Sequence, residues 1–364
     1  MNAVSSFSPT DEFYMRYAMA LAEQARGFTS PNPLVGAVVV KDHKIISEGY
    51  HEYFGGPHAE INALNNAQTN LHGATMYVTL EPCAFTNKKT PPCAPQLINA
   101  GLKRVVIGSV DPNPMNSNKG VRILRQAGIE VIVGVLADEI KRQNESYFKY
   151  IKQKIPFVTL KLALTLDGKI ATIRGQSQWI TSKTSREYVQ LLRKDADAIL
   201  VGIGTVIKDD PHLTCRIAPK KKLWRIILDP NFKIPKNAQV LHQRGPVLIF
   251  VNKRKLNKIP KSLGAEIVPL ACDNEFDWGE ILSELGKRNI ASLLIEGGAQ
   301  IASSALKSQI VDKVYLFYAP KILGQGLGFS DYLISKNLES ALKLKEYSIV
   351  RCDVDFIIKG VLDK

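Results

Sequence analysis

The sequence predicts an α/β protein built from two consecutive α/β domains. The chain has 364 residues, and at roughly 150 residues per domain this length is enough for two independent cores. Strand-forming and helix-forming segments alternate along both halves, as they do in sheets covered by helices. A polar, helix-favouring segment over residues 138–154 precedes Pro156 and separates the two alternating series. We therefore expect the domain boundary in this segment.

The first series predicts a three-layer domain with a mixed sheet over residues 1–148. Apolar residues at helical spacing after Ser8-Pro9-Thr10 predict a helix at 11–26. Two strands at 35–41 and 44–50 are joined by a short turn. The elements expected after them are helices at 58–67, 94–100 and 119–127, and strands at 74–80, 104–109 and 130–135.

The second series predicts an independent α/β unit over residues 149–364. The strands are expected at 157–163, 198–201, 224–228, 247–251, 292–295 and 313–318, with one more near the C-terminus. The helices are expected at 185–195, 278–287 and 300–306. No internal repeat relates the two halves.

The charge of the chain is unevenly distributed. The net charge is +14, yet residues 1–150 hold 14 Lys and Arg against 13 Asp and Glu, and the surplus lies in residues 151–364. The opening stretch MNAVSSFSPTDEF does not resemble a secretory signal. No apolar run approaches the roughly 20 residues that span a membrane. Five cysteines, an odd number, do not indicate a disulfide scaffold. We expect a soluble, cytoplasmic protein without a membrane partner.

The strongest functional signal is a set of zinc-binding residue types in the first half. His58-Ala59-Glu60 is followed by Pro82-Cys83 and then by Cys93. A catalytic zinc takes three nitrogen or sulfur ligands from the protein and leaves a fourth position for water. Helix N-termini near the cysteines would favour thiolates. The pattern is typical of zinc deaminases, in which the glutamate moves protons and is not a ligand.

This pattern predicts one zinc ion per chain, bound by His58, Cys83 and Cys93, with Glu60 as the catalytic residue. Zinc lowers the pKa of a bound water to about 7, and the glutamate can pass a proton to the departing ammonia. A structural zinc, or a coincidence of buried residues, stays open as an alternative, although a structural site has no use for Glu60. The remaining cysteines are scattered singly and are expected to be small core residues.

Longer motifs around these residues resemble one enzyme family. They are Pro31-Asn32-Pro33-Leu34-Val35-Gly36, Gly49-Tyr50-His51, Pro57-His58-Ala59-Glu60, Val78-Thr79-Leu80-Glu81-Pro82-Cys83, Thr90-Pro91-Pro92-Cys93 and Asp111-Pro112-Asn113-Pro114. In this order they resemble the bifunctional riboflavin-biosynthesis deaminase/reductases. The resemblance implies a cytidine-deaminase-like domain and a substrate that is a diaminopyrimidinone ribosylamine phosphate. It also implies that this substrate is held by Asn32, His51, Lys89 and Asn113.

The loop between the two cysteines departs from the family pattern. The family reads C-S-H-x-G-K/R-T-P-P-C, whereas here the loop is one residue longer and lacks the histidine and the glycine. The zinc-ligand residues are kept, so we expect the chemistry to be kept. Either Lys88 or Lys89 could contact the substrate phosphate. The alternative is that both lysines only keep the loop soluble.

The second half carries signals of a nucleotide site. Glu296-Gly297-Gly298 before a predicted helix would leave backbone N–H groups free for a phosphate. Gly202-Ile203-Gly204 lacks the third glycine of a dinucleotide fingerprint. Either glycine pair is equally explained by a tight turn. Asp167 lies in a Leu-Asp-Gly turn and is expected to shape that turn or to take part in proton transfer.

Taken together, the motifs of residues 155–330 resemble the reductase half of the same family, which is similar in fold to dihydrofolate reductase. The resemblance implies that NADPH is bound by Ala163, Trp179, Thr205, Asp209, Gly297, Gly298, Ala299, Gln300 and Ile301. It implies that the substrate contacts Ser177, Arg193, Leu213, Arg216 and Glu296. Two arginines suit a phosphate clamp, and the alternative for each is a solvated surface charge.

Two other functions remain to be weighed. A nucleic-acid-editing zinc deaminase with a basic binding module would explain the charge of the second half. Its lysine runs lack the interleaved aromatic residues that single-strand binders use, and the deaminase half is nearly neutral, so we expect no nucleic-acid partner. The second half could alternatively be a regulatory nucleotide-binding module without turnover. Two-domain enzymes of this kind often associate, and a homo-oligomer (a dimer or a tetramer) is expected.

Overall fold

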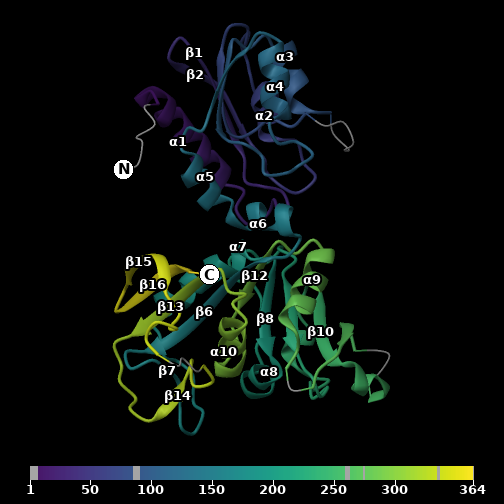
Figure 1. Cartoon of the computed structure of the whole chain (residues 1–364), viewed down its shortest axis with the longest axis vertical. Coiled ribbons are helices and arrows are strands. Elements are labelled where there is room, and N and C mark those ends of the chain that lie inside the picture. Colours follow the sequence, from purple (N-terminus) through teal and green to yellow (C-terminus); the bar gives the residue numbers. More distant parts are fainter. Residues whose placement is uncertain (1–6, 85–90, 259–262, 274, 334–336, 364) are drawn as a thin grey trace. The chain divides into compact units, whose positions relative to one another are not determined.

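The computed structural model describes residues 7–84, 91–258, 263–273, 275–333 and 337–363 (Figure 1). The chain divides into two compact units, Met1–Lys154 and Ile155–Lys364. The division falls at the end of the polar segment 138–154, while the limits 1–148 and 149–364 remain a prediction for the two catalytic domains.

The first unit contains one five-stranded sheet in the order β2-β1-β3-β4-β5. Strand β1 is antiparallel to β2 and β3, whereas β3, β4 and β5 run parallel. The strands are β1 (Gly36–Lys41), β2 (Lys44–Tyr50), β3 (Thr75–Leu80), β4 (Arg104–Ser109) and β5 (Glu130–Val133). The helices are α1 (Pro9–Glu23), α2 (Ala59–Asn65), α3 (Cys93–Asn99), α4 (Lys119–Gln126), α5 (Ala137–Gln143) and α6 (Glu145–Gln153).

Helices cover both faces of this sheet, as the three-layer prediction requires. Alternate residues of β1 point to opposite faces. Ala37 and Val39 join a core with α2, α3 and α4, while Val38 and Val40 join a core with α1 and α5. Because β3 and β4 are parallel neighbours, the loops that follow them emerge at the same edge of the sheet. This edge carries the predicted zinc site.

The second unit is built on a nine-stranded sheet in the order β11-β10-β9-β8-β12-β6-β13-β16-β15. The strands from β11 to β13 are parallel, and β16 and β15 are antiparallel at the other edge. They are β6 (Phe157–Thr165), β8 (Ala198–Gly202), β9 (Trp224–Leu228), β10 (Val247–Asn252), β11 (Glu266–Leu270), β12 (Ser292–Ile295), β13 (Lys313–Ala319), β15 (Leu344–Cys352) and β16 (Asp355–Leu362). A separate pair consists of β7 (Lys169–Thr172) and β14 (Gly326–Gly328).

Helices lie on both faces of the large sheet as well (Figure 1). They are α7 (Lys183–Asp195), α8 (Ile203–Asp209), α9 (Trp278–Lys287) and α10 (Ala299–Lys307), with short 3-10 turns η1 (Gln239–Leu241) and η2 (Lys253–Lys258). Apolar residues of α9 and α10 pack into one core with β6, and those of α8 pack into a second core with β8, β9 and β10. The two-domain α/β fold class is confirmed.

Several elements were not predicted, and each has a physical reason. Helix α8 begins within Gly202-Ile203-Gly204, where two glycines lower the helix propensity. Strand β11 contains Pro269, which a strand tolerates at the edge of a sheet. The single strand expected near the C-terminus is the hairpin of β15 and β16, and the short β7 and β14 were also missed.

The burial of three cysteines agrees with one further expectation. Cys215, Cys272 and Cys352, which are not part of the predicted zinc site, are buried, as expected of small core residues. Within the described part of the chain, no helix is both long enough and apolar enough to cross a membrane.

Candidate active sites

Three different elements position the predicted zinc ligands. His58 is the residue directly before α2, Cys83 lies in the loop after β3, and Cys93 is the first residue of α3. Both cysteines are buried. The backbone N–H of Cys93 donates to Cys83 Sγ at 3.2 Å. A donor at this distance stabilises a thiolate more than a thiol, so the start of α3 prepares Cys83 for a metal.

The three ligand atoms converge on one point. His58 Nδ1 lies 3.5 Å from Cys83 Sγ and 3.4 Å from Cys93 Sγ, and all three atoms are within 4.8 Å of one another. A tetrahedral zinc with Zn–N of about 2.1 Å and Zn–S of about 2.3 Å would separate a nitrogen and a sulfur ligand by about 3.6 Å. The donor set and its spacing therefore fit zinc, and three protein ligands leave the fourth position open.

Glu60 stands beside these ligands in the first turn of α2. Its side chain is buried, and it lies within hydrogen-bonding reach of Cys93. Burial raises the pKa of the Glu60 carboxyl. A raised pKa makes a carboxylate a stronger base, and a pKa nearer the working pH suits a general acid–base catalyst. The geometry of Glu60 suits proton transfer next to the metal.

The predicted pyrimidine contacts lie in loops at the same edge of the sheet. Asn32 Nδ2 and His51 Nε2 are 3.2 Å apart, and His51 Nδ1 lies 2.9 Å from the carbonyl oxygen of Pro57. The tautomer that satisfies both contacts donates from Nδ1 and accepts at Nε2. Burial lowers the pKa of His51, which favours this neutral form. The His51 ring, 5.6 Å from the His58 ring, thus holds Asn32 beside the metal site.

Asn113 belongs to the loop after β4, which is held by buried carboxylates. Its backbone N–H donates to Asp111 Oδ1 at 2.9 Å, and its side-chain oxygen accepts from Met115 N–H. Asp111 N–H in turn donates to Glu81, a buried carboxylate that also accepts from the N–H groups at the start of α4. Sequence reasoning missed this role of Glu81. The predicted contact Lys89 and its alternative Lys88 lie outside the described residues.

In the second unit, the predicted nucleotide residues gather at the carboxyl ends of parallel strands. Strand β12 lies between β8 and β6, so Glu296, the segment after β8 and the end of β6 share one edge. Ligands of open α/β sheets bind at such an edge. A Cβ on Gly298 would meet no atom within 4 Å, whereas one on Gly297 would collide with Ile301. Gly297 therefore serves packing, and Gly298 leaves the start of α10 open to a phosphate.

Charged residues at this edge form a largely buried cluster, in which the side chains of Arg193 and Glu296 are 17% and 10% exposed. The guanidinium of Arg193, at the end of α7, donates from Nε and Nη2 to the two oxygens of Glu296 at 2.7 and 2.9 Å. Its Nη1 donates to the carbonyl oxygen of Thr214, beside Leu213. Burial alone would lower the pKa of Arg193 and raise that of Glu296, but their mutual attraction outweighs it and shifts both the other way. Three of the five Arg193 donors are thus used within the protein.

Lys161 is a member of this cluster that sequence reasoning did not select. It lies on β6, where burial lowers the pKa of its ammonium group and Glu296 counteracts this shift. The signal was present in the sequence, because Lys161 interrupts an otherwise apolar strand. A charged group shifted by burial in this way is typical of a functional site.

The other predicted residues of the second unit lie around this edge with different degrees of contact. Trp179 is exposed, with Arg186 4.4 Å above its ring and Lys321 Nζ donating to its carbonyl oxygen. Arg216 is exposed, while its backbone N–H donates to Gln190. Leu213 is buried and adopts φ 51, which is uncommon for leucine and marks a constrained loop. Half-buried positions are Ala163, Ser177, Thr205, Asp209 and Ile301, and the exposed Gln300 and buried Ala299 begin α10.

Asp167 shapes its turn, which was one of the two roles expected for it; the other was proton transfer. Its carboxylate accepts from the Thr165 hydroxyl and from the N–H groups of Leu323 and Gly324. The Thr165 hydrogen bond is the main reason that its pKa falls to about 2. Asp167 is therefore a carboxylate that ties two loops together.

These observations define the class of the protein as a zinc deaminase domain followed by a nicotinamide-dependent reductase domain. Residues 8–109 match the family described as cytidine and deoxycytidylate deaminase zinc-binding region, and residues 156–358 match the RibD C-terminal domain. The chain belongs to the RibD family, the bifunctional deaminase/reductases of riboflavin biosynthesis.

Relatives match over nearly the whole chain. Riboflavin biosynthesis protein RibD of Aquifex aeolicus is 46% identical over 351 residues, which cover 96% of this chain and 97% of the relative. The Escherichia coli protein of the same description is 38% identical, with 86% and 89% covered.

Two solved structures are also similar. One is a diaminohydroxyphosphoribosylaminopyrimidine deaminase/5-amino-6-(5-phosphoribosylamino)uracil reductase from Thermotoga maritima, with a TM-score of 0.87 and 41% identity over 97% of this chain and 98% of that chain. The other is Acinetobacter baumannii RibD, with a TM-score of 0.87 and 35% identity over 98% and 99%. The predicted family and the predicted pair of activities are confirmed. They replace the alternative of a nucleic-acid-editing deaminase.

Proposed function

We propose that the chain deaminates a diaminopyrimidinone ribosylamine phosphate and then reduces the ribosyl group of the product to ribityl with NADPH. The observation that carries this proposal is the convergence of His58, Cys83 and Cys93 beside the buried Glu60, in a chain whose second unit is a RibD C-terminal domain. The Thermotoga maritima protein, whose description states this pair of reactions, supports the substrate class.

In the deaminase step, the chain's own residues hold the substrate and move one proton. Zinc, when bound, acidifies water and so supplies the nucleophile at neutral pH. Glu60 takes a proton from that water and delivers it to the amino group that leaves as ammonia. Asn32, positioned by His51, and Asn113 offer donors and acceptors to the ring edge. Lys89 is proposed as a phosphate contact.

In the reductase step, the protein orients two ligands. The bound nicotinamide supplies the hydride. We assign its binding to Ala163, Trp179, Thr205, Asp209 and the turn formed by Gly297, Gly298, Ala299, Gln300 and Ile301. The open approach at Gly298 suits a phosphate at the start of α10. We propose that two arginines bind the substrate phosphate: Arg216, and Arg193 through the Nη hydrogens that it does not use within the protein. The other proposed substrate contacts are Ser177, Leu213 and Glu296.

We also propose that the enzyme acts in the cytoplasm as a homo-oligomer. Five cysteines that form no disulfide with one another suit a reducing compartment. Strand β15 lies at the edge of the large sheet with Tyr347 and Ile349 exposed, and apolar edge strands favour pairing with another chain. Light scattering of the purified chain measures its oligomeric state directly.

Steady-state assays on the purified, zinc-loaded chain test the proposed reactions. We expect ammonia release from the phosphorylated diaminopyrimidinone without any nucleotide. We expect NADPH oxidation only with the deaminated product, and a lower rate with NADH. Ammonia release without subsequent NADPH oxidation would contradict the reductase assignment and favour a regulatory module. Absence of ammonia release would contradict the substrate.

A further inference from the structure

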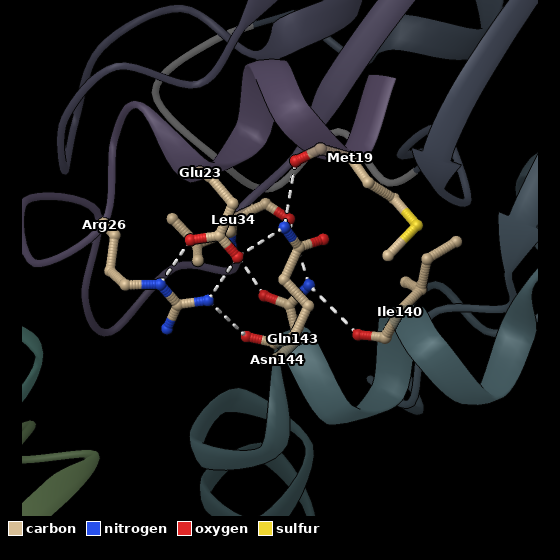
Figure 2. Close-up of polar contacts among 7 residues, drawn as sticks. All are labelled: Met19, Glu23, Arg26, Leu34, Ile140, Gln143 and Asn144. Atoms are coloured by element: carbon tan, nitrogen blue, oxygen red, sulfur yellow. Dashed lines mark hydrogen bonds and ion pairs between the residues drawn. The ribbon is translucent and has the colours of Figure 1, made fainter. Parts of the chain in front are cut away.

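The corner between α5 and α6 makes polar contacts with two loops of the deaminase unit that are distant in sequence. Asn144 is the residue between these helices, and its side chain is buried. Its Oδ1 accepts from Leu34 N–H at 2.7 Å, and its Nδ2 donates to the Leu34 carbonyl oxygen at 3.0 Å. Figure 2 shows this amide turned toward the backbone of Leu34. One side chain thus satisfies both backbone groups of a loop residue 110 positions away.

Tyr147, in the first turn of α6, holds the second loop. The Tyr147 hydroxyl donates to Asp111 Oδ1 at 2.8 Å. The same oxygen accepts from the backbone N–H of Asn113, and Asp111 Oδ2 accepts from Asn116 Nδ2 at 3.1 Å. Asn116 Oδ1 then accepts from the N–H of Ala84, the neighbour of Cys83. Tyr147 is therefore tied through one carboxylate to the loop of Asn113.

Both contacts fall two residues from a proposed pyrimidine contact, since Leu34 follows Asn32 and Asp111 precedes Asn113. The loops themselves have little regular structure to fix them, so their position depends on such side-chain contacts. The corner is in turn fastened to α1, because Gln143 Nε2 donates to the Met19 carbonyl oxygen and to Glu23 (Figure 2). A rigid corner of this kind is able to set the distance between the two asparagines.

We propose that Asn144 and Tyr147 are positioning residues for the pyrimidine substrate of the deaminase. They act through Asn32 and Asn113, to whose loops their hydrogen bonds lead. This inference rests on the proposed function in one respect, namely that these two asparagines contact the ring. Displaced asparagines would make poorer hydrogen bonds to the ring and so weaken substrate binding. The expected signature is a raised KM for deamination with little change in kcat and in zinc content.

Tyr147→Phe in the full chain is the direct test, because it removes only the hydroxyl. Tyr77→Phe is a matched control, since the Tyr77 hydroxyl also donates to a buried carboxylate, Asp11, at 3.0 Å on the α1 side of the sheet. For Tyr147→Phe we expect the KM of the phosphorylated diaminopyrimidinone to rise about fivefold, with kcat within about twofold of wild type. Tyr77→Phe is expected to lower the melting temperature and leave KM unchanged.

Asn144→Ala tests the contact with the Leu34 backbone and whether this contact acts through Asn32. We expect KM to rise about tenfold, and this rise to disappear in an Asn32→Ala background, because two residues that act through one contact are not additive. Two results would overturn the inference. One is an equal rise in KM from Asn144→Ala in the wild-type and Asn32→Ala backgrounds. The other is a Tyr147→Phe chain that loses stability as Tyr77→Phe does while its KM stays unchanged. In either case ammonia release by the wild-type chain would leave the proposed deamination intact. If Asn144→Ala does not fold, Tyr147→Phe decides alone.

Discussion

The two units hold their predicted site residues in opposite ways. In the deaminase unit, His58, Cys83 and Cys93 turn their ligand atoms toward one shared point. In the reductase unit, Arg193 and Glu296 pair with each other, and the part open to a ligand is the backbone at Gly298. The site of the first unit depends on which side chains are present, because a metal needs particular donor atoms. The second relies on backbone geometry and on the chemistry of its cofactor.

The largest expected effect is the loss of one zinc ligand. Cys93→Ser removes a thiolate from a set of three, so we expect zinc to be lost and ammonia release to fall at least a thousandfold, while NADPH-dependent reduction persists. Metal analysis and both activity assays check this. Cys272→Ser, at another buried cysteine, is the matched control and should keep one zinc per chain. Retention of zinc and deamination in Cys93→Ser would remove Cys93 from the site.

A smaller effect is expected at the ion pair of the reductase unit. Arg193→Ala leaves the largely buried carboxylate of Glu296 without its main partner, which costs about 2–3 kcal/mol of unfolding free energy. It also removes the proposed phosphate donors. We expect reductase kcat/KM to fall about tenfold to a hundredfold, and deamination to stay within about twofold.

Arg104→Ala is the control for this change, because Arg104 makes a similar two-pronged pair with Asp11 at 2.8 and 2.9 Å. That pair lies outside both predicted sites. We expect Arg104→Ala to lower stability and spare both activities. Equal losses of reductase activity in the two variants would show that Arg193 acts only on stability.

The smallest effect concerns stability and pH at Asp11. Hydrogen bonds from Arg104 hold the pKa of Asp11 below its ordinary value of 3.8. A carboxyl with a lowered folded-state pKa stabilises the fold above its unfolded pKa, and this contribution is lost as the pH falls through the folded value. Asp11→Asn should therefore destabilise the deaminase unit by about 1 kcal/mol at pH 7.

Calorimetry from pH 7 to pH 3 measures this difference. The wild-type and Asp11→Asn melting temperatures should approach each other as the pH falls below about 4. A difference that grows toward acid pH would contradict the role of the Asp11 carboxylate.

Much of this molecule was predictable from local patterns. The bounds of β2, β4, β9, α9 and β12 agree with the predicted ranges, because hydrophobic periodicity and turn residues act over a few positions. The zinc ligands and Glu60 were predicted from their residue types and spacing. In contrast, the hydrogen bond between Asn144 and Leu34 joins residues 110 positions apart, and that between Tyr147 and Asp111 joins residues 36 positions apart. Such partners are set by tertiary packing, which no local pattern contains.

The same limit explains what was missed in the second unit. Arg193 was predicted as a free phosphate ligand, and its pairing with Glu296 joins residues 103 positions apart. Lys161 was visible only as a charge within an apolar strand. Its importance follows from the parallel register that places β12, and thus Glu296, next to β6.

The most direct test of two separate chemistries on one chain is Glu60→Gln, measured in both assays on one preparation. The substitution keeps the size of the side chain and removes its ability to carry a proton. We predict that ammonia release falls about a thousandfold or more, that one zinc stays bound, and that reduction of the pre-deaminated substrate with NADPH proceeds at the wild-type rate. Ammonia release near the wild-type rate, or an equal loss of reduction, would contradict the account.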